Sequence, residues 1–139
     1  MAPRKRSSTR VIGRSALKAA SMGCGVDIIE CDRFRQAVKR GGEAFLRRVF
    51  TDAERRYVHG RHNGIVRLAA RFAAKEAVFK AMSQIAPTRS LALNQIEIRN
   101  DALGRPSAHL RNWPTPQPTI HVSLSHVNRV AIACAIAQR

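Results

Sequence analysis

Residues 64–83, GIVRLAARFAAKEAVFKAMS, decide how this chain folds. The stretch consists largely of good helix formers and has no internal proline or glycine, so it predicts one long helix that Pro87 terminates. At about 100° per residue, one side of this helix collects the large apolar side chains of Ile65, Leu68, Phe72 and Phe79. Glu76 projects near the centre of that apolar arc. We therefore expect a carboxylate on the side of the long helix that faces the core.

The segment before the long helix predicts one strand and two shorter helices. Residues 23–29, GCGVDII, are typical of a buried central strand. A helix over 33–40 follows, with Asp32 as its expected N-cap. Residues 51–54, TDAE, have the capping-box pattern, in which a Thr hydroxyl and a Glu carboxylate each accept a bond from a free backbone N–H. They open a helix that we expect to end near Gly60.

After the long helix the hydrophobic period changes to that of strands. Alternation predicts strands at 95–98 and 120–125, and an apolar run predicts a final strand at 130–136. Residues 101–104, DALG, predict a turn, and three prolines make 112–118 a stiff linker. The order of strand, helices and strands predicts an α+β fold with helices packed on a largely antiparallel sheet.

The composition is that of one soluble globular domain with an anionic partner. The length of 139 residues suits a single core, and no apolar run approaches the ~20 residues of a bilayer span. A net charge of +16, from 25 Lys and Arg against 9 Asp and Glu, suits nucleic acid, a phosphorylated ligand, a membrane surface or an acidic protein. Cys24, Cys31 and Cys134 lack disulfide or zinc spacing, so we expect reduced, buried thiols and a cytoplasmic protein.

Charge divides the chain into a basic extension, 1–22, and a folded domain, 23–139. The extension carries several basic residues and no acid, while the domain holds every acidic residue. Three interpretations remain open: a solvated basic arm, an organellar transit peptide, or codons upstream of a true start at Met22.

Two acids interrupt apolar patterns, Asp27 in the first strand and Glu76 on the long helix. An acid buried without a partner costs several kcal/mol. Lys80, one turn after Glu76, offers a simple ion pair, and a strand-end cap or an arginine would explain Asp27. Alternatively, Mg²⁺ shared by both acids would satisfy them together, with water and phosphate oxygens as its other ligands. Both explanations remain open on this pattern alone.

Ser123, Ser125 and His126 end the predicted strand at 120–125. His126 suits phosphate binding or proton transfer, or is simply a solvated turn residue. A Ser–His triad lacks support because the G-x-S-x-G elbow is absent. His59 and His62 have the spacing of a metal pair, but their basic surroundings favour a solvated loop. The nucleotide-binding glycine motifs are also absent.

Four segments together resemble one known family. They are GCGVDIIE at 23–30, RFAAKEAVFK at 71–80, IEI with a following GRP at 96–106, and VSLSH at 122–126. In sequence and spacing, over residues 23–137, they resemble the holo-[acyl-carrier-protein] synthase family of 4′-phosphopantetheinyl transferases. The resemblance implies a compact α+β fold with one long central helix, assembled as a homotrimer with active sites at subunit interfaces.

The resemblance also implies a reaction and roles for individual residues. The 4′-phosphopantetheine group of coenzyme A would pass to a serine of apo acyl carrier protein, releasing adenosine 3′,5′-bisphosphate, as in fatty acid biosynthesis. Asp27 and Glu76 would hold Mg²⁺, and Lys80 would compensate charge on the diphosphate. Glu76 is our candidate for the base that accepts the serine proton, with Asp27 as the alternative.

Further contacts to both substrates are implied by position. Arg71 and His126 match contacts to coenzyme A phosphates. The family commonly has a glycine-rich turn after the lysine that matches Lys80, whereas this chain has MSQIAP at 82–87, so Ser83 would have to replace a backbone contact. The acidic carrier protein is expected to dock on the basic first helix, which carries Arg33, Arg35, Lys39 and Arg40.

Two other functions compete with this assignment. The sequence pI of about 11.6 and the basic extension suit a small nucleic-acid-binding protein. Only one Tyr and one Trp are present for base stacking, and the basic helices serve an acidic protein equally well, so we expect neither nucleic acid nor a membrane as partner. A catalytically silent assembly subunit is disfavoured because Asp27, Glu76 and Lys80 are all present.

Overall fold

The structure, a computed structural model, describes residues 19–139. The predicted extension up to residue 18 lies outside the described residues. The chain forms β1 (Met22–Glu30), α1 (Cys31–Val49), α2 (Asp52–Val58) and α3 (Gly64–Ile85). It continues through a 3-10 turn, η2 (Leu93–Gln95), to β2 (Ile96–Asn100), β3 (Pro106–Leu110), β4 (Thr119–His126) and β5 (Val130–Gln138). This order of elements confirms the predicted α+β class.

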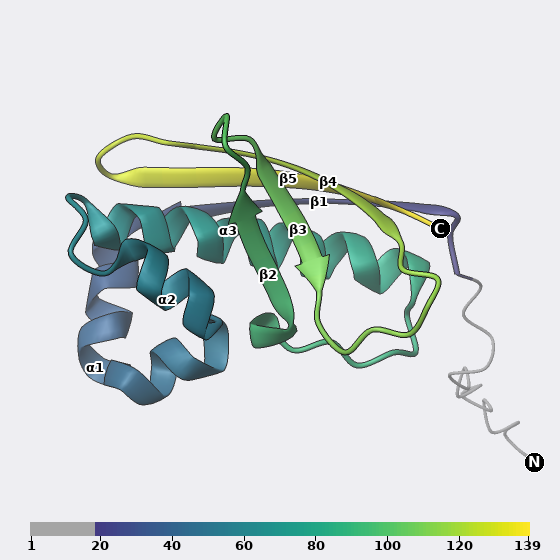
Figure 1. The fold of residues 1–139 in the computed structure, drawn as a ribbon, viewed down its shortest axis with the longest axis horizontal. Helices are drawn as coiled ribbons and strands as arrows, with labels where there is room; N and C mark the ends of the chain where they lie inside the picture. Colours follow the sequence, from purple (N-terminus) through teal and green to yellow (C-terminus); the bar gives the residue numbers. More distant parts are fainter. Residues whose placement is uncertain (1–18) are drawn as a thin grey trace, which may run out of the picture.

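The strands form two antiparallel units around α3. β1, β5 and β4 make a three-stranded sheet in that order, and β2 pairs with β3. Figure 1 shows α3 running beneath the sheet, with β2 and β3 crossing it and α1 and α2 gathered at its N-terminal end. β5 is therefore the central strand, and the expectation that β1 is central was wrong. The place of β1 could not be predicted from sequence because its partner β5 lies at the other end of the chain.

Helix α3 approaches β1 unusually closely because small residues face each other. A Cβ added at Gly25 would lie 2.0 Å from the Ala77 carbonyl oxygen, and one added at Gly23 would lie 2.1 Å from that of Ala81. Two residues along a strand span about 6.6 Å, close to the ~6 Å that four residues span along a helix. Each step of two residues along β1 therefore matches one turn back along α3. One further step from Gly25 places Asp27 beside the turn of α3 that ends at Glu76.

The apolar arc of α3 faces the core only in part. Leu68 is buried, and Ile65 and Phe72 pack against the core near α1 and α2. Phe79, however, is 40% exposed, whereas Arg71 and Lys75 are buried. The most deeply buried positions are mostly alanines, because only small side chains fit against β1 and β5. Glu76 consequently lies half-buried at the margin of the sheet contact and not at the centre of an apolar face.

Two core regions meet along α3. One lies between α3, the sheet and the β2–β3 hairpin, and contains Val78, Ile96 and Leu110. The other lies where α1 and α2 meet α3, and is built around Phe34, whose ring centroid is 5.5 Å from that of Phe72. The long helix thus belongs to both regions, as expected for a central helix.

The first two helices confirm one prediction and correct another. At α2, Thr51 and Glu54 form the predicted capping box, with the Glu54 carboxylate accepting a bond from Thr51 N at 2.8 Å. Helix α1 begins at Cys31, two residues earlier than predicted, so Glu30 and not Asp32 is its N-cap residue, and Asp32 pairs with Arg35 at 2.6 Å within the first turn. It also continues to Val49, past a break at Gly42, which has a φ of 54°.

The C-terminal half adds one strand that the sequence pattern did not predict, β3. Its partner β2 is joined to it by the predicted turn, in which Asp101 accepts bonds from the backbone N–H groups of Arg105 and Leu103, both at 2.9 Å. The Arg105 backbone N–H and guanidinium, followed by the Leu103 N–H, hold the pKa of Asp101 below its ordinary value. Residues 112–118 connect β3 to β4.

Other features differ from expectation at the N-terminal boundary and on the sheet. Ala20 N donates to Gln84 O at 2.9 Å and Arg139 N to Ser21 O at 3.1 Å, so packed structure begins before residue 23. All three cysteines are free, but Cys24 and Cys134 are exposed, because they lie on the sheet face opposite α3. Across residues 19–139 we find no helix with the length and apolar character needed to span a membrane.

Candidate active site

Asp27 and Lys80 bring β1 and α3 together at the predicted site. Lys80 Nζ lies 2.8 Å from Asp27 Oδ1 and donates to Val26 O at 2.9 Å. The Asp27 side chain is 17% exposed, and its second oxygen, Oδ2, is buried with no hydrogen-bond partner among residues 19–139. The simple pairing of Lys80 with Glu76 is therefore replaced by a pair with Asp27, which leaves one carboxylate oxygen unsatisfied.

Glu76 faces the same space as Asp27. Burial raises the pKa of Glu76, the Asp27 charge raises it further, and Lys80 opposes them. Two neighbouring carboxylates, one with an orphan oxygen, supply the hard oxygen donors that Mg²⁺ takes from proteins. Among the described residues no group of three or more His, Cys, Asp and Glu forms a metal cage. The residues therefore fit a cation completed by water and ligand oxygens.

The end of α3 differs from a phosphate-binding turn. The helix continues to Ile85, so its final N–H groups serve the helix, and the Ser83 hydroxyl donates to Lys80 O at 2.7 Å. Sequence reasoning missed Gln84, whose side chain donates to Cys24 O at 2.6 Å and accepts from Cys24 N at 3.2 Å. Its only sequence signal is its position four residues after Lys80 on the same side of the helix.

Arg71 is buried and held by neighbours within the chain. Its guanidinium lies 4.1 Å from the centroid of the Tyr57 ring and donates to Asn100 Oδ1 at 2.8 Å. Asn100 in turn donates to Gly104 O at 2.9 Å, in the β2–β3 turn. Arg71 therefore connects α3 to α2 and to that turn. Its contact with coenzyme A stays a prediction.

His126 is exposed at the end of β4, far from Asp27 within one chain. Asp27 pairs with Ala133 on β5, and Ala133 pairs with Leu124 on β4. Two strand spacings across and two residues along the sheet separate His126 from Asp27 by about 12 Å. The structure does not bring these two predicted site residues together in a single subunit.

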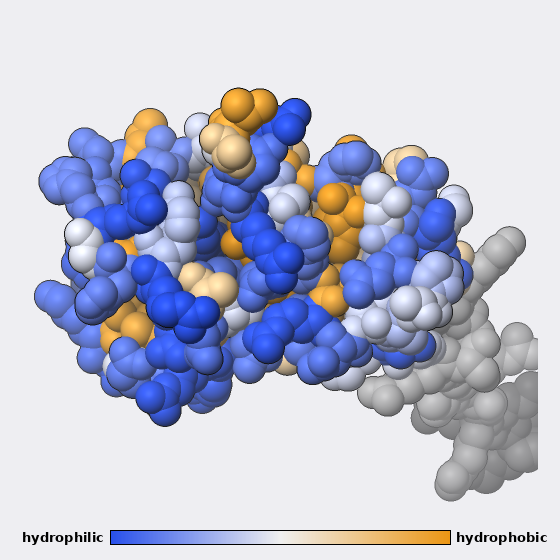
Figure 2. Space-filling view, in the orientation of Figure 1, coloured by the Kyte–Doolittle hydropathy of each residue, from blue (hydrophilic) through white to orange (hydrophobic). Residues whose placement is uncertain are grey.

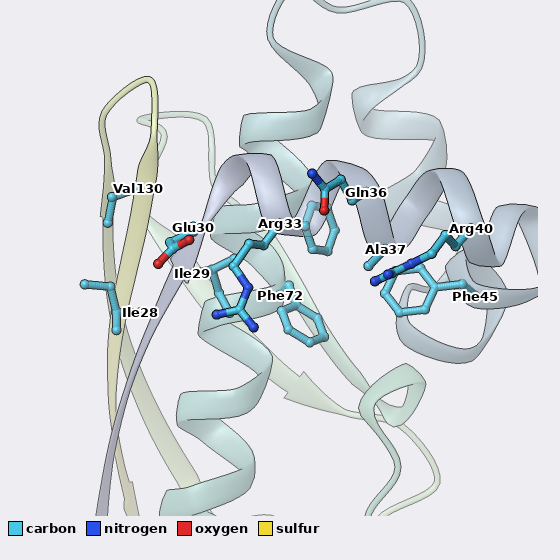
Figure 3. Close-up of a pocket in the computed structure, with 11 residues that line it drawn as sticks. Ile28, Ile29, Glu30, Arg33, Gln36, Ala37, Arg40, Phe45, Phe72 and Val130 are labelled. Carbon is cyan, nitrogen blue, oxygen red and sulfur yellow. The ribbon is translucent and has the colours of Figure 1, made fainter.

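The basic residues of α1 border a cavity next to the site. Its volume is about 840 Å³, and it lies between α1, α3 and the end of β1, with Arg33, Arg40, Phe45 and Phe72 in its lining. Figure 3 shows the Arg33 and Arg40 side chains extending along it near the two rings. Arg35 is paired with Asp32, and Lys39 is exposed outside the lining. Figure 2 shows a largely hydrophilic surface over α1 and α2.

Sequence reasoning also missed a fully buried ion pair. Lys75 Nζ lies 2.7 Å from Glu54 Oε2, and both side chains are at most 1% exposed. The sequence shows Lys75 only as a lysine among alanines next to Glu76. A helical projection alone does not tell whether a lysine in that position is buried or exposed.

Comparison with known proteins shows the class to which this chain belongs. The family model described as the 4′-phosphopantetheinyl transferase superfamily matches residues 23–136. The chain is therefore a transferase of this class, as its resemblance indicated.

Individual relatives narrow the assignment. A holo-[acyl-carrier-protein] synthase from Thermodesulfovibrio yellowstonii is 38% identical over 114 residues, which cover 82% of this chain and 96% of the relative. The crystal structure of a Bacillus anthracis holo-(acyl-carrier-protein) synthase in complex with CoA (3′,5′-ADP) matches with a TM-score of 0.70 and 30% identity, covering 84% of this chain and 95% of that one. The ACPS–CoA complex from Chronobacterium ammoniagenes matches with a TM-score of 0.74 and 28% identity, covering 86% and 98%. The chain belongs to the holo-[acyl-carrier-protein] synthase family.

Proposed function

We propose that this enzyme transfers 4′-phosphopantetheine from coenzyme A to a serine hydroxyl of apo acyl carrier protein, with Mg²⁺, and releases adenosine 3′,5′-bisphosphate. The observation that carries the proposal is the cluster of Asp27, Glu76 and Lys80, with its unsatisfied carboxylate oxygen. The coenzyme A complexes of the Bacillus anthracis and Chronobacterium ammoniagenes proteins support the choice of donor.

Asp27 and Glu76 would hold the cation, one from β1 and one from α3. Bound Mg²⁺ would supply positive charge to the pyrophosphate of coenzyme A and polarise the phosphorus under attack. Lys80 has three N–H donors and uses two of them on Asp27 and Val26. No residue in the described part of the chain takes the third donor, which could bind a phosphate oxygen, and the side chain is 48% exposed.

We assign the base to Glu76 in preference to Asp27. One Asp27 oxygen already accepts a bond from Lys80, and the other is buried. Glu76 is only half-buried, and no described residue forms an ion pair with it. It is therefore better placed to accept the proton of an incoming serine hydroxyl. Arg71, His126 and Ser83 remain candidates for holding the phosphates of coenzyme A.

We propose assembly as a homotrimer, which the open face of the sheet supports. Val26 and Ile28 of β1 and Ile132 and Ile136 of β5 are between 43% and 65% exposed on the face opposite α3. An apolar face of this kind fits burial against other copies of the chain. Sites at subunit interfaces would also give Asp27 a His126 from a second copy.

We propose that the carrier protein docks on α1. Arg33 and Arg40 line the cavity beside the end of β1, the strand that also carries Asp27. Arg35 and Lys39 add positive charge to α1. An acidic carrier, such as that of fatty acid biosynthesis, fits this surface. The three free thiols suit a reducing cytoplasm.

The test is incubation with apo carrier protein, coenzyme A and Mg²⁺, followed by intact mass measurement. We expect the carrier to gain the mass of one phosphopantetheine, adenosine 3′,5′-bisphosphate to appear in equal amount, and chelation of Mg²⁺ to stop both. An unmodified carrier under these conditions, with the enzyme folded, would overturn the proposal.

A further inference from the structure

The buried pair of Glu54 and Lys75 has no part in the proposed chemistry, yet it lies one residue from Glu76. Lys75 Nζ contacts Glu54 Oε2 at 2.7 Å, Leu93 O at 3.0 Å and Ile96 O. A lysine ammonium has three donors, so each of them has a partner. Such an ammonium has one orientation.

Glu54 is fixed just as completely. Its Oε1 accepts from Ile98 N at 2.8 Å, and its Oε2 accepts from Thr51 N at 2.8 Å. The pair therefore ties α3 to the start of α2 and to the first residues of β2. On its other side, α3 rests against β1 at Gly25, where Lys80 and Gln84 bond to that strand through long side chains.

We propose that Lys75, held by Glu54, is a positioning residue that sets the rotation of α3 and so directs Glu76 towards Asp27. The inference rests on the proposed function of Glu76 and Asp27 as metal ligands. It differs from a purely structural role because it predicts a defect in metal binding that loss of stability does not explain.

The geometry makes rotation the sensitive variable. A side-chain carboxylate lies about 5–6 Å from a helix axis, so a rotation of ~10° moves it by about 1 Å. Functional groups must be held within ~0.5 Å of their working positions. The contact of glycine and alanine surfaces limits how far α3 stands from β1, and the bonds of Lys80 and Gln84 to β1 come from exposed, flexible side chains. Lys75 adds three directed bonds from a fully buried side chain, and these restrain the rotation of the helix from the other side.

The experiment compares Lys75→Met, which keeps most of the side-chain volume, with Thr51→Ala as a matched control. Thr51 Oγ1 caps α2 by accepting from Glu54 N at 3.3 Å, so its loss destabilises the same region without touching Lys75. We expect Lys75→Met to raise the Mg²⁺ concentration for half-maximal activity at least tenfold. The same variant should lose the rise in Tm that Mg²⁺ alone produces, while KM for the carrier changes less than twofold.

Thr51→Ala should lower Tm but leave both Mg²⁺ measurements within twofold of the wild type. If Lys75→Met does not fold, Glu54→Gln, which keeps shape and one acceptor, provides the test, with an expected rise of at least threefold. A folded Lys75 or Glu54 variant with wild-type Mg²⁺ dependence overturns the positioning role, and so does an equal shift in Thr51→Ala. A wild-type enzyme without Mg²⁺ dependence would instead overturn the proposed function itself.

Discussion

The close contact between β1 and α3 makes Gly25→Ala the sharpest perturbation of the site. The new Cβ would lie 2.0 Å from Ala77 O and 3.0 Å from the Lys80 Cβ. The first distance is about 1 Å shorter than contacts of this kind in proteins. Because both near atoms belong to α3, the helix must move away from β1 by a similar amount.

That displacement is expected to cost far more activity than stability. Overpacking of this size destabilises a protein by about 1–3 kcal/mol, which the domain can tolerate. A shift of ~1 Å between Asp27 and Glu76 is enough to lower catalysis about a hundredfold. We therefore expect a folded variant whose kcat/KM falls roughly a hundredfold, measured by intact mass of the carrier over time, with stability measured by urea unfolding.

Gly60→Ala is the control for stability. Gly60 has a φ of 70° and open space around it, so alanine strains the backbone by about 1–2 kcal/mol without moving α3 against β1. Its activity at 25 °C should stay within twofold of the wild type. A folded Gly25→Ala enzyme with near-normal turnover would refute the claim that the site depends on this contact.

Three further predictions concern the acids, the docking helix and the β2–β3 turn. Asp27→Asn and Glu76→Gln should each fold and lose Mg²⁺-dependent transfer. A variant that is largely unfolded, but whose remaining folded molecules keep near-normal activity, would contradict the metal assignment. Arg33→Glu with Arg40→Glu should raise KM for the carrier about tenfold, roughly 1.4 kcal/mol, while KM for coenzyme A changes less than twofold; equal changes in both would exclude α1 from docking. Because the pKa of Asp101 is lower in the folded protein than its unfolded value of about 3.9, the ionised carboxylate stabilises the fold above that pH, and this stabilisation is lost as pH falls through the folded pKa. The difference in unfolding free energy between wild type and Asp101→Asn, measured in urea, should therefore shrink in acid; a constant difference would contradict this role.

Local patterns predicted the elements better than they predicted which surfaces meet. The capping box at Thr51 and Glu54 was found from four residues, because both of its bonds form within one turn. The buried side of α3 was predicted only in part: Leu68 and Phe72 pack in the core, but Phe79 is exposed, and the buried alanines gave no signal because large side chains were taken to mark the core. Burial there is decided by closeness to β1, and that selects alanine.

The site was predictable where an acid stood in an apolar pattern. Asp27 and Glu76 were found in this way, and the structure brings them together. The partner of Lys80 was not predictable, because Asp27 is distant in sequence and lies close only through the packing of β1 on α3. For the same reason Lys75 and Glu54 gave no signal as a pair, although Glu54 was marked as a capping residue and Lys75 stood beside Glu76.

The bonds that Lys80 and Gln84 make to β1 also protect an edge strand. β1 ends the sheet on one side, and the outward backbone groups of such a strand are a template for pairing with another chain. Gln84 occupies the N–H and C=O of Cys24, and Lys80 occupies the C=O of Val26. The lysine that we assign to the phosphates therefore also covers one hydrogen-bonding group of this edge strand. Replacing it removes a charge from the site and uncovers a hydrogen-bonding edge in the same step, so soluble yield has to be measured alongside activity for any variant at this position.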